Sequence, residues 1–347
     1  MMKKRILVIA TSRKTRGGIT SVIKAHSTQS YWKEWNCKWL ETHIDKNIFY
    51  KLWYFIKSFT KFLFIVPFYD IIHIHLSEVQ SLKRKTFYFL ICRLLKKRII
   101  IHFHAFSPET TINSKYKWLY KSVFNTSNCI IVLSDLWKKW VIEYLDLKES
   151  KIFVIYNPCP KVNLSQEIKK ENIILFAGTI NERKGYSTLI SAFANVANKY
   201  PDWSLFFAGN GEIEKAKILV DKFNISSQVK FLGWIKDNEK ESIFNKASIF
   251  CLPSYNEGFP MAVLDAWAYG IPTISTPVGG MPDIGIHSEN CLFFKPGNID
   301  ELTECIVKLI NDENLRIKLR KESINLSNTI FNQEIIGNKI SQLYASL

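Results

Sequence analysis

Two acidic residues and a helix start lie close together in the segment from Ile249 to Ile284. Glu257 stands in a polar loop, and Asp265 follows it with seven residues between them. Pro260 suits the first position of a helix, because its fixed φ matches the helix and its missing N–H is not needed there. The open amides of a helix start attract anions. Together these residues predict a nucleotide-sugar site, with amides for the diphosphate and carboxylates for ribose and hexose hydroxyls.

The same segment resembles the acid-x7-acid signature of glycosyltransferase family 4, whose members are retaining enzymes of the GT-B fold. The resemblance rests on EGFPMAVLDAWA, beginning at Glu257, and on GIPTISTPVGG, beginning at Gly270. The family usually has Glu at the second acid, and Asp265 is one methylene shorter. The alternative is an ordinary βαβ unit with solvated acids. The resemblance implies a donor-binding role for Gly258, Phe259, Pro260, Met261 and Asp265, and a catalytic role for Glu257 at the sugar hydroxyls.

A second loop, from Gly178 to Gly185, resembles the family loop that grips the donor diphosphate with cations. Lys184 matches the family lysine, which implies a catalytic role, whereas Thr179 replaces the family arginine. Arg183 is adjacent and either supplies the second charge or is solvated. Two cations against two phosphates make strong charge-assisted hydrogen bonds. Further along, Gly209 lies in a tight turn within reach of the donor, and Trp234-Ile235 match the place where the family backbone pairs with the base.

Glycine and histidine residues mark the first half of the chain. Gly17-Gly18 follow the first strand and resemble the family's glycine loop near the donor phosphates and the acceptor. The cations of this loop either meet an anionic acceptor or are solvated: Arg13, Lys14 and Arg16.

The segments Asp70 to Leu76 and Arg98 to Ala105 each read as a buried strand that ends in His-x-His. Because strand side chains alternate, both histidines of a pair share one face. His104 best matches the family histidine that faces the donor sugar, which makes it the third catalytic candidate. His75 resembles another histidine that lines the cleft, while His73 and His102 are expected to be structural. A four-histidine metal site is the disfavoured alternative, and we expect no metal or other cofactor. The polar loop after the second pair, Ala105 to Ser114, suits acceptor contact.

The elements that position these residues alternate between apolar runs and helices, as in a doubly wound parallel sheet. The chain of 347 residues favours two domains. The expected fold is α/β of the GT-B type, with two Rossmann-like domains facing across a central cleft. We expect an acceptor-binding domain over 1–160, a linker over 161–171 and a nucleotide-sugar-binding domain over 171–330. The resemblance to GT-B enzymes also implies that a C-terminal helix over 331–347 crosses back to the first domain.

The net charge of +16 suggests an anionic partner. In Lys51 to Phe68 and Thr86 to Ile101, basic residues are interleaved with large apolar ones. Neither segment offers the roughly twenty uncharged apolar residues of a spanning helix, but each can rest on a bilayer by an aromatic face with a cationic rim. The alternative is a core helix with a solvated basic edge. No base-stacking or groove-reading motif accompanies the charge, so nucleic acid is not expected. The seven cysteines include no CxxC pair and no metal-finger spacing, and no signal peptide is apparent, which favours the cytoplasm. With the basic aromatic segments, this predicts the inner face of the plasma membrane.

These observations, with the retaining mechanism that the resemblance implies, predict transfer of a hexosyl residue from a nucleoside-diphosphate sugar, with UDP as the expected nucleotide. The expected acceptor is a hydroxyl of a glycan, carried on a polyprenyl lipid, in surface-polysaccharide synthesis. No covalent nucleophile is evident, so front-face attack is expected, with electrostatic stabilisation of the leaving diphosphate. A nucleotide-sugar epimerase or hydrolase on the same fold is the main alternative, and a non-catalytic binding protein is the third.

Overall fold

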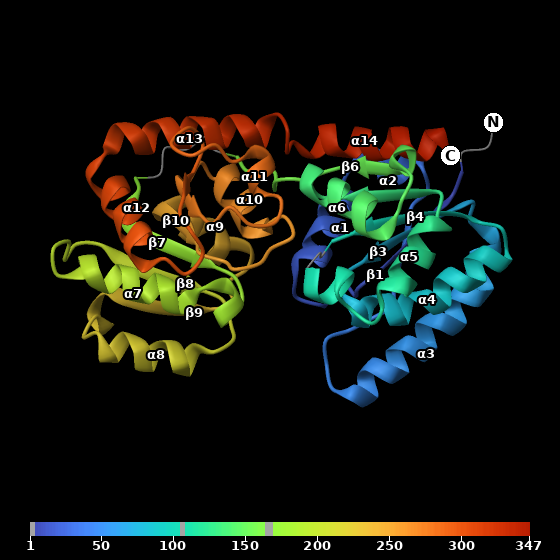
Figure 1. The fold of residues 1–347 in the computed structure, drawn as a ribbon, viewed down its shortest axis with the longest axis horizontal. Coiled ribbons are helices and arrows are strands. Elements are labelled where there is room, and N and C mark those ends of the chain that lie inside the picture. The colour runs from blue at the N-terminus through green and yellow to red at the C-terminus, as the bar shows by residue number, and fades with distance from the viewer. Residues whose placement is uncertain (1–3, 105–107, 164–168) are drawn as a thin grey trace. The chain divides into compact units, whose positions relative to one another are not determined.

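Short apolar runs of the sequence form buried parallel strands. The computed structural model describes residues 4–104, 108–163 and 169–347, and within it the chain divides into two units (Figure 1). The first unit comprises Met1–Pro158 and Gln333–Leu347, and the second comprises Cys159–Asn332. Each unit holds one parallel six-stranded sheet. The predicted α/β class with two Rossmann-like domains is therefore confirmed.

The first sheet has the strand order β2-β1-β3-β4-β5-β6. Every residue of β1, β3 and β5 is buried, as expected where helices cover both faces of a parallel sheet. The strands are β1 (Ile6–Ala10), β2 (Lys38–Glu41), β3 (Ile71–Leu76), β4 (Arg98–Phe103), β5 (Cys129–Val132) and β6 (Ile152–Val154). The helices are α1 (Gly18–Ser27), α2 (Ser30–Glu34), α3 (Ile48–Ile65), η1 (Val66–Phe68), α4 (Val79–Leu94), η2 (Pro108–Ile112), α5 (Lys117–Asn125), α6 (Asp135–Leu145) and η3 (Glu149–Lys151).

The first unit also contains the last helix of the chain, α14 (Gln333–Ser346). The hydroxyl of Tyr344 on α14 lies 2.6 Å from Nδ1 of His73 on β3. The indole N–H of Trp35 donates to the hydroxyl of Ser341 at 2.8 Å. Through these contacts α14 packs on the first unit. His73 and Tyr344 are 271 positions apart in the sequence.

The second sheet has the strand order β12-β11-β10-β7-β8-β9. Its strands are β7 (Glu171–Ala177), β8 (Ser204–Ala208), β9 (Val229–Gly233), β10 (Ala247–Leu252), β11 (Thr273–Ser275) and β12 (Leu292–Phe293). Its helices are η4 (Glu182–Lys184), α7 (Tyr186–Ala197), α8 (Ile213–Lys222), η5 (Ser226–Gln228), α9 (Asp237–Lys246), α10 (Met261–Ala268), α11 (Met281–Ile284), α12 (Ile299–Asn311) and α13 (Glu313–Asn328). The order places β7 and β10 side by side, so the loops that follow them meet at the same edge of the sheet.

Helix boundaries in both units follow capping rules. The side chain of Asn47 accepts the amide of Tyr50 at the start of α3, and Ser134 accepts the amide of Trp137 at the start of α6. Pro260 directly precedes α10, and Gly270 follows its end with a φ of +60°. The side chains of Asn47 and Ser134 satisfy amides that a helix start leaves open.

Candidate active site

The carboxyl edge of the second sheet holds two loops that pack on each other, one after β7 and one after β10. Gly185 has a φ of +71°, and a Cβ at this position would lie 2.0 Å from the carbonyl oxygen of Pro253. The amide of Tyr255 donates to the carbonyl of Arg183 at 2.8 Å. A glycine is therefore required for the close approach that holds the two loops together.

Lys184 and Glu257 meet within these loops. The ammonium of Lys184 contacts Oε1 of Glu257, and the hydroxyl of Ser254 donates to the same oxygen at 2.7 Å. The side chains of Lys184 and Glu257 are 14% and 9% exposed. A nearly buried ion pair of this kind needs further hydrogen bonds to offset its lost hydration, and Ser254 supplies one. The structure thus brings together two of the three side chains that the sequence predicts to be catalytic.

Arg183 points a different way from its neighbour. Its guanidinium donates to the carbonyl oxygen of Asn256 at 2.7 Å, and the residue is exposed. A carbonyl group carries no net charge, so this hydrogen bond does not neutralise the positive charge of Arg183. Arg183 therefore offers an accessible cation beside the partly buried ammonium of Lys184.

The loop that leads from Glu257 into α10 is fixed by the turn after β11. The amide of Gly280 donates to the carbonyl of Gly258 at 2.7 Å. A Cβ on Gly279, which has a φ of +63°, would lie 2.3 Å from the carbonyl oxygens of Glu257 and Gly258. Phe259 is buried and packs against Phe331, with ring centroids 5.1 Å apart. Pro260 and Met261 then occupy the cap and first position of α10.

Asp265 lies in a separate ion pair. Its carboxylate is 2.7 Å from the ammonium of Lys240 on α9, and its side chain is 18% exposed. Burial raises the pKa of Asp265, and the charge and hydrogen bond of Lys240 oppose that shift. The structure therefore assigns the two acids of the signature to different cations. Contact between Asp265 and a ribose stays a prediction.

The remaining donor positions of the second unit lie at or just beyond strand ends. Gly209 follows β8, and a Cβ there would lie 1.7 Å from the carbonyl oxygen of Gly178, so the backbones after β7 and β8 touch. Trp234 is 39% exposed and directly follows β9, with Ile235 half-buried beside it. Their contacts with a nucleotide stay predictions.

In the first unit, the four predicted strand histidines form a buried stack. His75 Nδ1 and His104 Nε2 are 2.7 Å apart. Ring centroids of His73 and His75 are separated by 4.6 Å, and those of His102 and His104 by 4.2 Å. Burial lowers the pKa of all four imidazoles, and that of His73 falls to about 3.

The stack bears on metal binding, because ring nitrogens of His73, His75 and His102 lie within 4.8 Å of one another. Their rings are roughly parallel, with interplanar angles of 13° to 32°. Lone pairs in the planes of stacked rings run side by side rather than converging on one ion, as zinc ligands must. The geometry favours a packed core of neutral imidazoles, and His104 at its edge is 9% exposed.

The glycine loop of the first unit adopts a backbone that requires its first glycine. Gly17 caps α1 with a φ of +145°, Gly18 is the first residue of the helix, and both are exposed. Part of the predicted acceptor loop, Ala105 to Ser114, lies outside the described residues at 105–107. The described part forms η2 and the turn that follows it.

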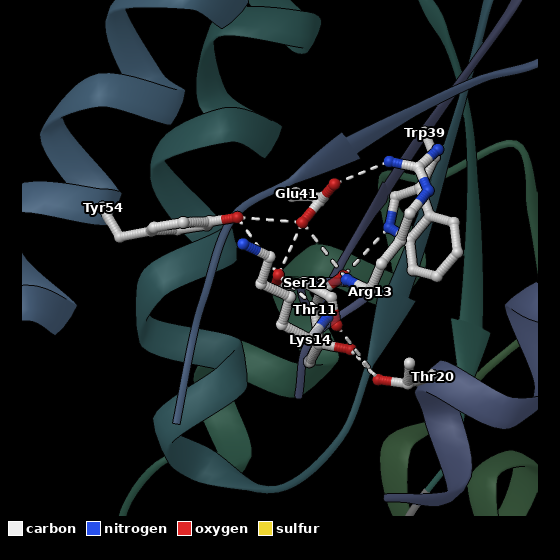
Figure 2. A network of polar contacts seen from close by, with 8 residues as sticks. All are labelled: Thr11, Ser12, Arg13, Lys14, Thr20, Trp39, Glu41 and Tyr54. Carbon is white, nitrogen blue, oxygen red and sulfur yellow. Dashed lines mark hydrogen bonds and ion pairs between the residues drawn. The ribbon is translucent and has the colours of Figure 1, made fainter. Parts of the chain in front are cut away.

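Sequence reasoning missed a polar centre at the carboxyl ends of β1 and β2. Glu41 ends β2, and its carboxylate accepts hydrogen bonds from Ser12 at 2.5 Å, from Arg13 at 2.6 Å and from Tyr54 at 2.9 Å (Figure 2). The signal in the sequence was weak, because β2 has four residues and is charged at both ends. Lys240 was missed as well, since no motif marks its position on α9.

Comparison with known proteins agrees with this architecture. Residues 162–326 match the family model described as "Glycosyl transferases group 1", and residues 41–160 match "Glycosyltransferase Family 4". An uncharacterized glycosyltransferase of Methanocaldococcus jannaschii is 31% identical over 71% of this chain and 67% of the relative. The UDP-Gal:alpha-D-GlcNAc-diphosphoundecaprenol alpha-1,3-galactosyltransferase of Escherichia coli is 27% identical over 80% of this chain and 76% of the relative.

Coverage is lower for several other curated relatives, and the chain spans about half the length of some of them. Among solved structures, the Anabaena protein HepE in complex with UDP-glucose superposes with a TM-score of 0.80 at 17% identity, covering 99% of this chain and 100% of that one. This likeness establishes the GT-B fold. The two family matches and the 31% identical relative show that the chain belongs to the family 4 glycosyltransferases.

Proposed function

We propose that this protein is a retaining glycosyltransferase that moves a hexosyl residue from a UDP-sugar to a hydroxyl of a lipid-linked glycan. The contact between Lys184 and Glu257 carries the proposal, because it joins a cation and an acid at the carboxyl edge of a parallel sheet, where such folds bind ligands. The neighbouring Anabaena structure holds UDP-glucose, which supports the choice of donor.

The ion pair suggests how the donor is received. A diphosphate carries more charge than a carboxylate, so it competes with Glu257 for the ammonium of Lys184. Glu257, released from that contact but still held by Ser254, then accepts hydrogen bonds from hydroxyls of the sugar. Arg183 adds a second cation from the same loop. The charge that develops on the leaving diphosphate is thereby stabilised by groups fixed in advance.

The acceptor and the membrane contact are inferred from helix α3 and from one relative. The Escherichia coli relative is named for an acceptor carried on diphosphoundecaprenol. Phe49, Phe64 and Ile48 of α3 are 80%, 74% and 72% exposed, and α3 has no acidic residue. Such a helix suits the surface of an anionic bilayer. In the part of the chain that the structure describes, no helix is long and apolar enough to cross a membrane.

The transfer reaction is tested with a panel of UDP-, GDP- and ADP-sugars, first by thermal shift and then by turnover with a prenyl-diphosphate-linked acceptor. NMR of the new linkage gives its anomeric configuration, and a product of inverted configuration would overturn the retaining assignment. Incubation with the donor alone separates the alternatives, because an epimerase or hydrolase consumes the donor without an acceptor.

Membrane contact is tested by flotation with phosphatidylcholine vesicles that contain phosphatidylglycerol, at low salt. The double variant Phe49→Ser/Phe64→Ser should lose binding, because it removes exposed apolar area from α3. The matched control Ile218→Ser/Ile317→Ser changes residues that are 70% and 59% exposed in the second unit. Equal loss in both variants, or no binding by the unmodified protein, would refute the membrane contact.

A further inference from the structure

A pocket of about 230 Å³ lies in the first unit between α3 and the carboxyl ends of β1 and β2. It is lined by a loop residue, Arg13, by Trp39 and Glu41 of β2, and by residues of α3 that include Lys57 and Lys61. All of these elements belong to one unit, and the carboxyl edge of a parallel sheet is where ligands bind in such folds. The donor site described above lies in the other unit, so this pocket is free for another task.

The inner wall of the pocket is a fixed polar network. Burial raises the pKa of Glu41, but hydrogen bonds from Ser12, Tyr54 and Arg13 outweigh this effect and hold the pKa below its usual value. Glu41 therefore stays ionised. The guanidinium of Arg13 also stacks 4.4 Å from the ring centroid of Trp39. Figure 2 shows Tyr54 from α3 and Ser12 and Arg13 from the loop after β1 meeting at Glu41, with the ring of Trp39 beside Arg13.

The outer wall of the pocket carries two positive charges that are not paired with acidic residues in the part of the chain that the structure describes. Lys57 and Lys61 are exposed and stand one helical turn apart on α3, a helix without acidic residues. The ammonium of Lys57 lies 4.9 Å from the ring centroid of Trp53. Neither lysine has an acidic partner among the residues that the structure describes. Like charges at this spacing repel each other along a helix, and an anionic ligand between them would relieve that repulsion.

The surface beside the pocket is apolar. Trp53, Ile56 and Phe64 of α3 are 57%, 56% and 74% exposed. Helix α4 runs beside α3, with Phe87 packed against Phe55 at a centroid distance of 5.9 Å, and it exposes Leu90 and Leu94 (Figure 1). A ligand that fits both surfaces has a compact head with several negative charges and a hydrocarbon tail.

We propose that this pocket binds the diphosphate of the prenyl-linked acceptor, with Arg13, Lys57 and Lys61 on the diphosphate and the prenyl chain along the exposed face of α3. The proposal rests on the proposed function, because it specifies where the lipid part of the acceptor is held. A bulk phospholipid headgroup carries a single net charge and needs no cavity, whereas a diphosphate matches a pocket in which three cations share one carboxylate.

The test is calorimetric titration with farnesyl diphosphate, inorganic diphosphate and farnesol, in detergent-free buffer with saturating UDP. The UDP keeps the diphosphate site of the second unit occupied, and its own binding reports on the proposed function separately. Farnesyl diphosphate should bind more tightly than either fragment, because only it engages both surfaces. The variant Lys57→Gln/Lys61→Gln should weaken the binding of farnesyl diphosphate by about tenfold for each lysine lost. Both lysines are exposed, so the variant should fold.

The matched control is Lys24→Gln/Lys33→Gln, which removes the same charge from exposed positions of α1 and α2. Equal weakening in both variants would show general attraction to a basic protein and would overturn the proposal. Farnesol binding as tightly as farnesyl diphosphate would do the same.

A second arm compares phosphatidylcholine nanodiscs that contain undecaprenyl diphosphate with nanodiscs of equal charge made with phosphatidylglycerol. Preference for the diphosphate lipid supports the pocket, whereas equal binding assigns the lysines to bilayer charge alone and overturns it. If UDP binds and sugar is transferred while these tests fail, the pocket is refuted and the proposed function remains.

Discussion

Lys184 and Glu257 are separated by 73 positions in the sequence, yet the ammonium of one contacts the carboxylate of the other in a nearly buried pair. The contact exists because β7 and β10 are neighbours in the sheet, so the loops after them meet. In the absence of a ligand each charge compensates the other. Stability therefore depends on this pair, and under the proposed function activity depends on it as well, so substitutions can separate the two.

Removing one member of the pair should impair folding as well as turnover. Lys184→Met leaves the carboxylate of Glu257 without its cation, which costs roughly 3 kcal/mol or more for a buried pair. Glu257→Gln leaves the cation without its carboxylate. The double variant should lose less stability than the sum of the two single losses, because no unpaired charge remains. Urea unfolding measures the stabilities, and turnover should fall by orders of magnitude in all three variants.

The control for this cycle is Lys217→Met, which removes an exposed lysine that pairs with Glu214 on α8. Exposed pairs contribute little, so its stability should change by less than about 1 kcal/mol. Additive losses in the Lys184 and Glu257 cycle, or full turnover in Glu257→Gln, would contradict the account of the site.

Gly185 should tolerate no side chain. Gly185→Ala places a Cβ 2.0 Å from the carbonyl oxygen of Pro253 at a φ of +71°. The matched control is Gly233→Ala, because Gly233 has a φ of +66° and its nearest neighbouring atom would lie 3.8 Å away. Both variants carry the strain of a left-handed alanine, about 1 kcal/mol. Thermal unfolding should show a distinctly larger loss for Gly185→Ala, and similar losses would mean that the loops do not depend on this approach.

The sequence predicts the strands of both sheets well because buried parallel strands are continuous apolar runs. β1 and β3 are examples, with every residue buried. β2 was missed because only its two central residues are buried and both of its ends are charged. Because β2 was not predicted, Glu41 at its end was not predicted as a polar centre either. Glu41 joins α3 to the loop after β1 through Tyr54 and Ser12.

The site was predictable where its residues follow strand ends. Lys184 and Glu257 stand in loops after apolar runs, so a parallel sheet brings them to one edge. The pairing of Asp265 with Lys240 was not predictable, because it depends on how α9 and α10 lie next to each other in space. Spacing along the chain carries no information about such a contact.

Asp265 provides a direct test of ribose binding. Asp265→Asn should weaken the binding of UDP by about tenfold, because it loses charged hydrogen bonds to the ribose hydroxyls. The binding of 2′,3′-dideoxy-UDP, which lacks these hydroxyls, should not change. Lys240→Gln is the matched variant, because it breaks the same ion pair and keeps the carboxylate. Calorimetric titration of both nucleotides measures the difference. Equal weakening of the two nucleotides by Asp265→Asn would show that this carboxylate stabilises the fold and does not contact ribose.

Acid should unfold the first unit through its buried histidines. Burial lowers the pKa of His26 from 6.5 to about 4 and, together with the charge of His26, that of His73 to about 3. The unfolded chain therefore binds more protons than the folded one below pH 6.5, so stability is fully present above that pH and falls as the pH decreases towards 4 and then 3. The loss from His26 alone is roughly 3 kcal/mol, at about 1.4 kcal/mol for each pKa unit.

The substitution His26→Leu removes the contribution of His26 to this pH dependence of stability. Neither ring nitrogen of His26 has a hydrogen-bond partner among the described residues, so an apolar side chain removes the proton uptake without breaking a bond. Urea unfolding between pH 7.5 and pH 4.5 should give a shallower pH dependence for His26→Leu, by about one proton. An unchanged slope in His26→Leu would show that His26 does not stay neutral in the folded protein.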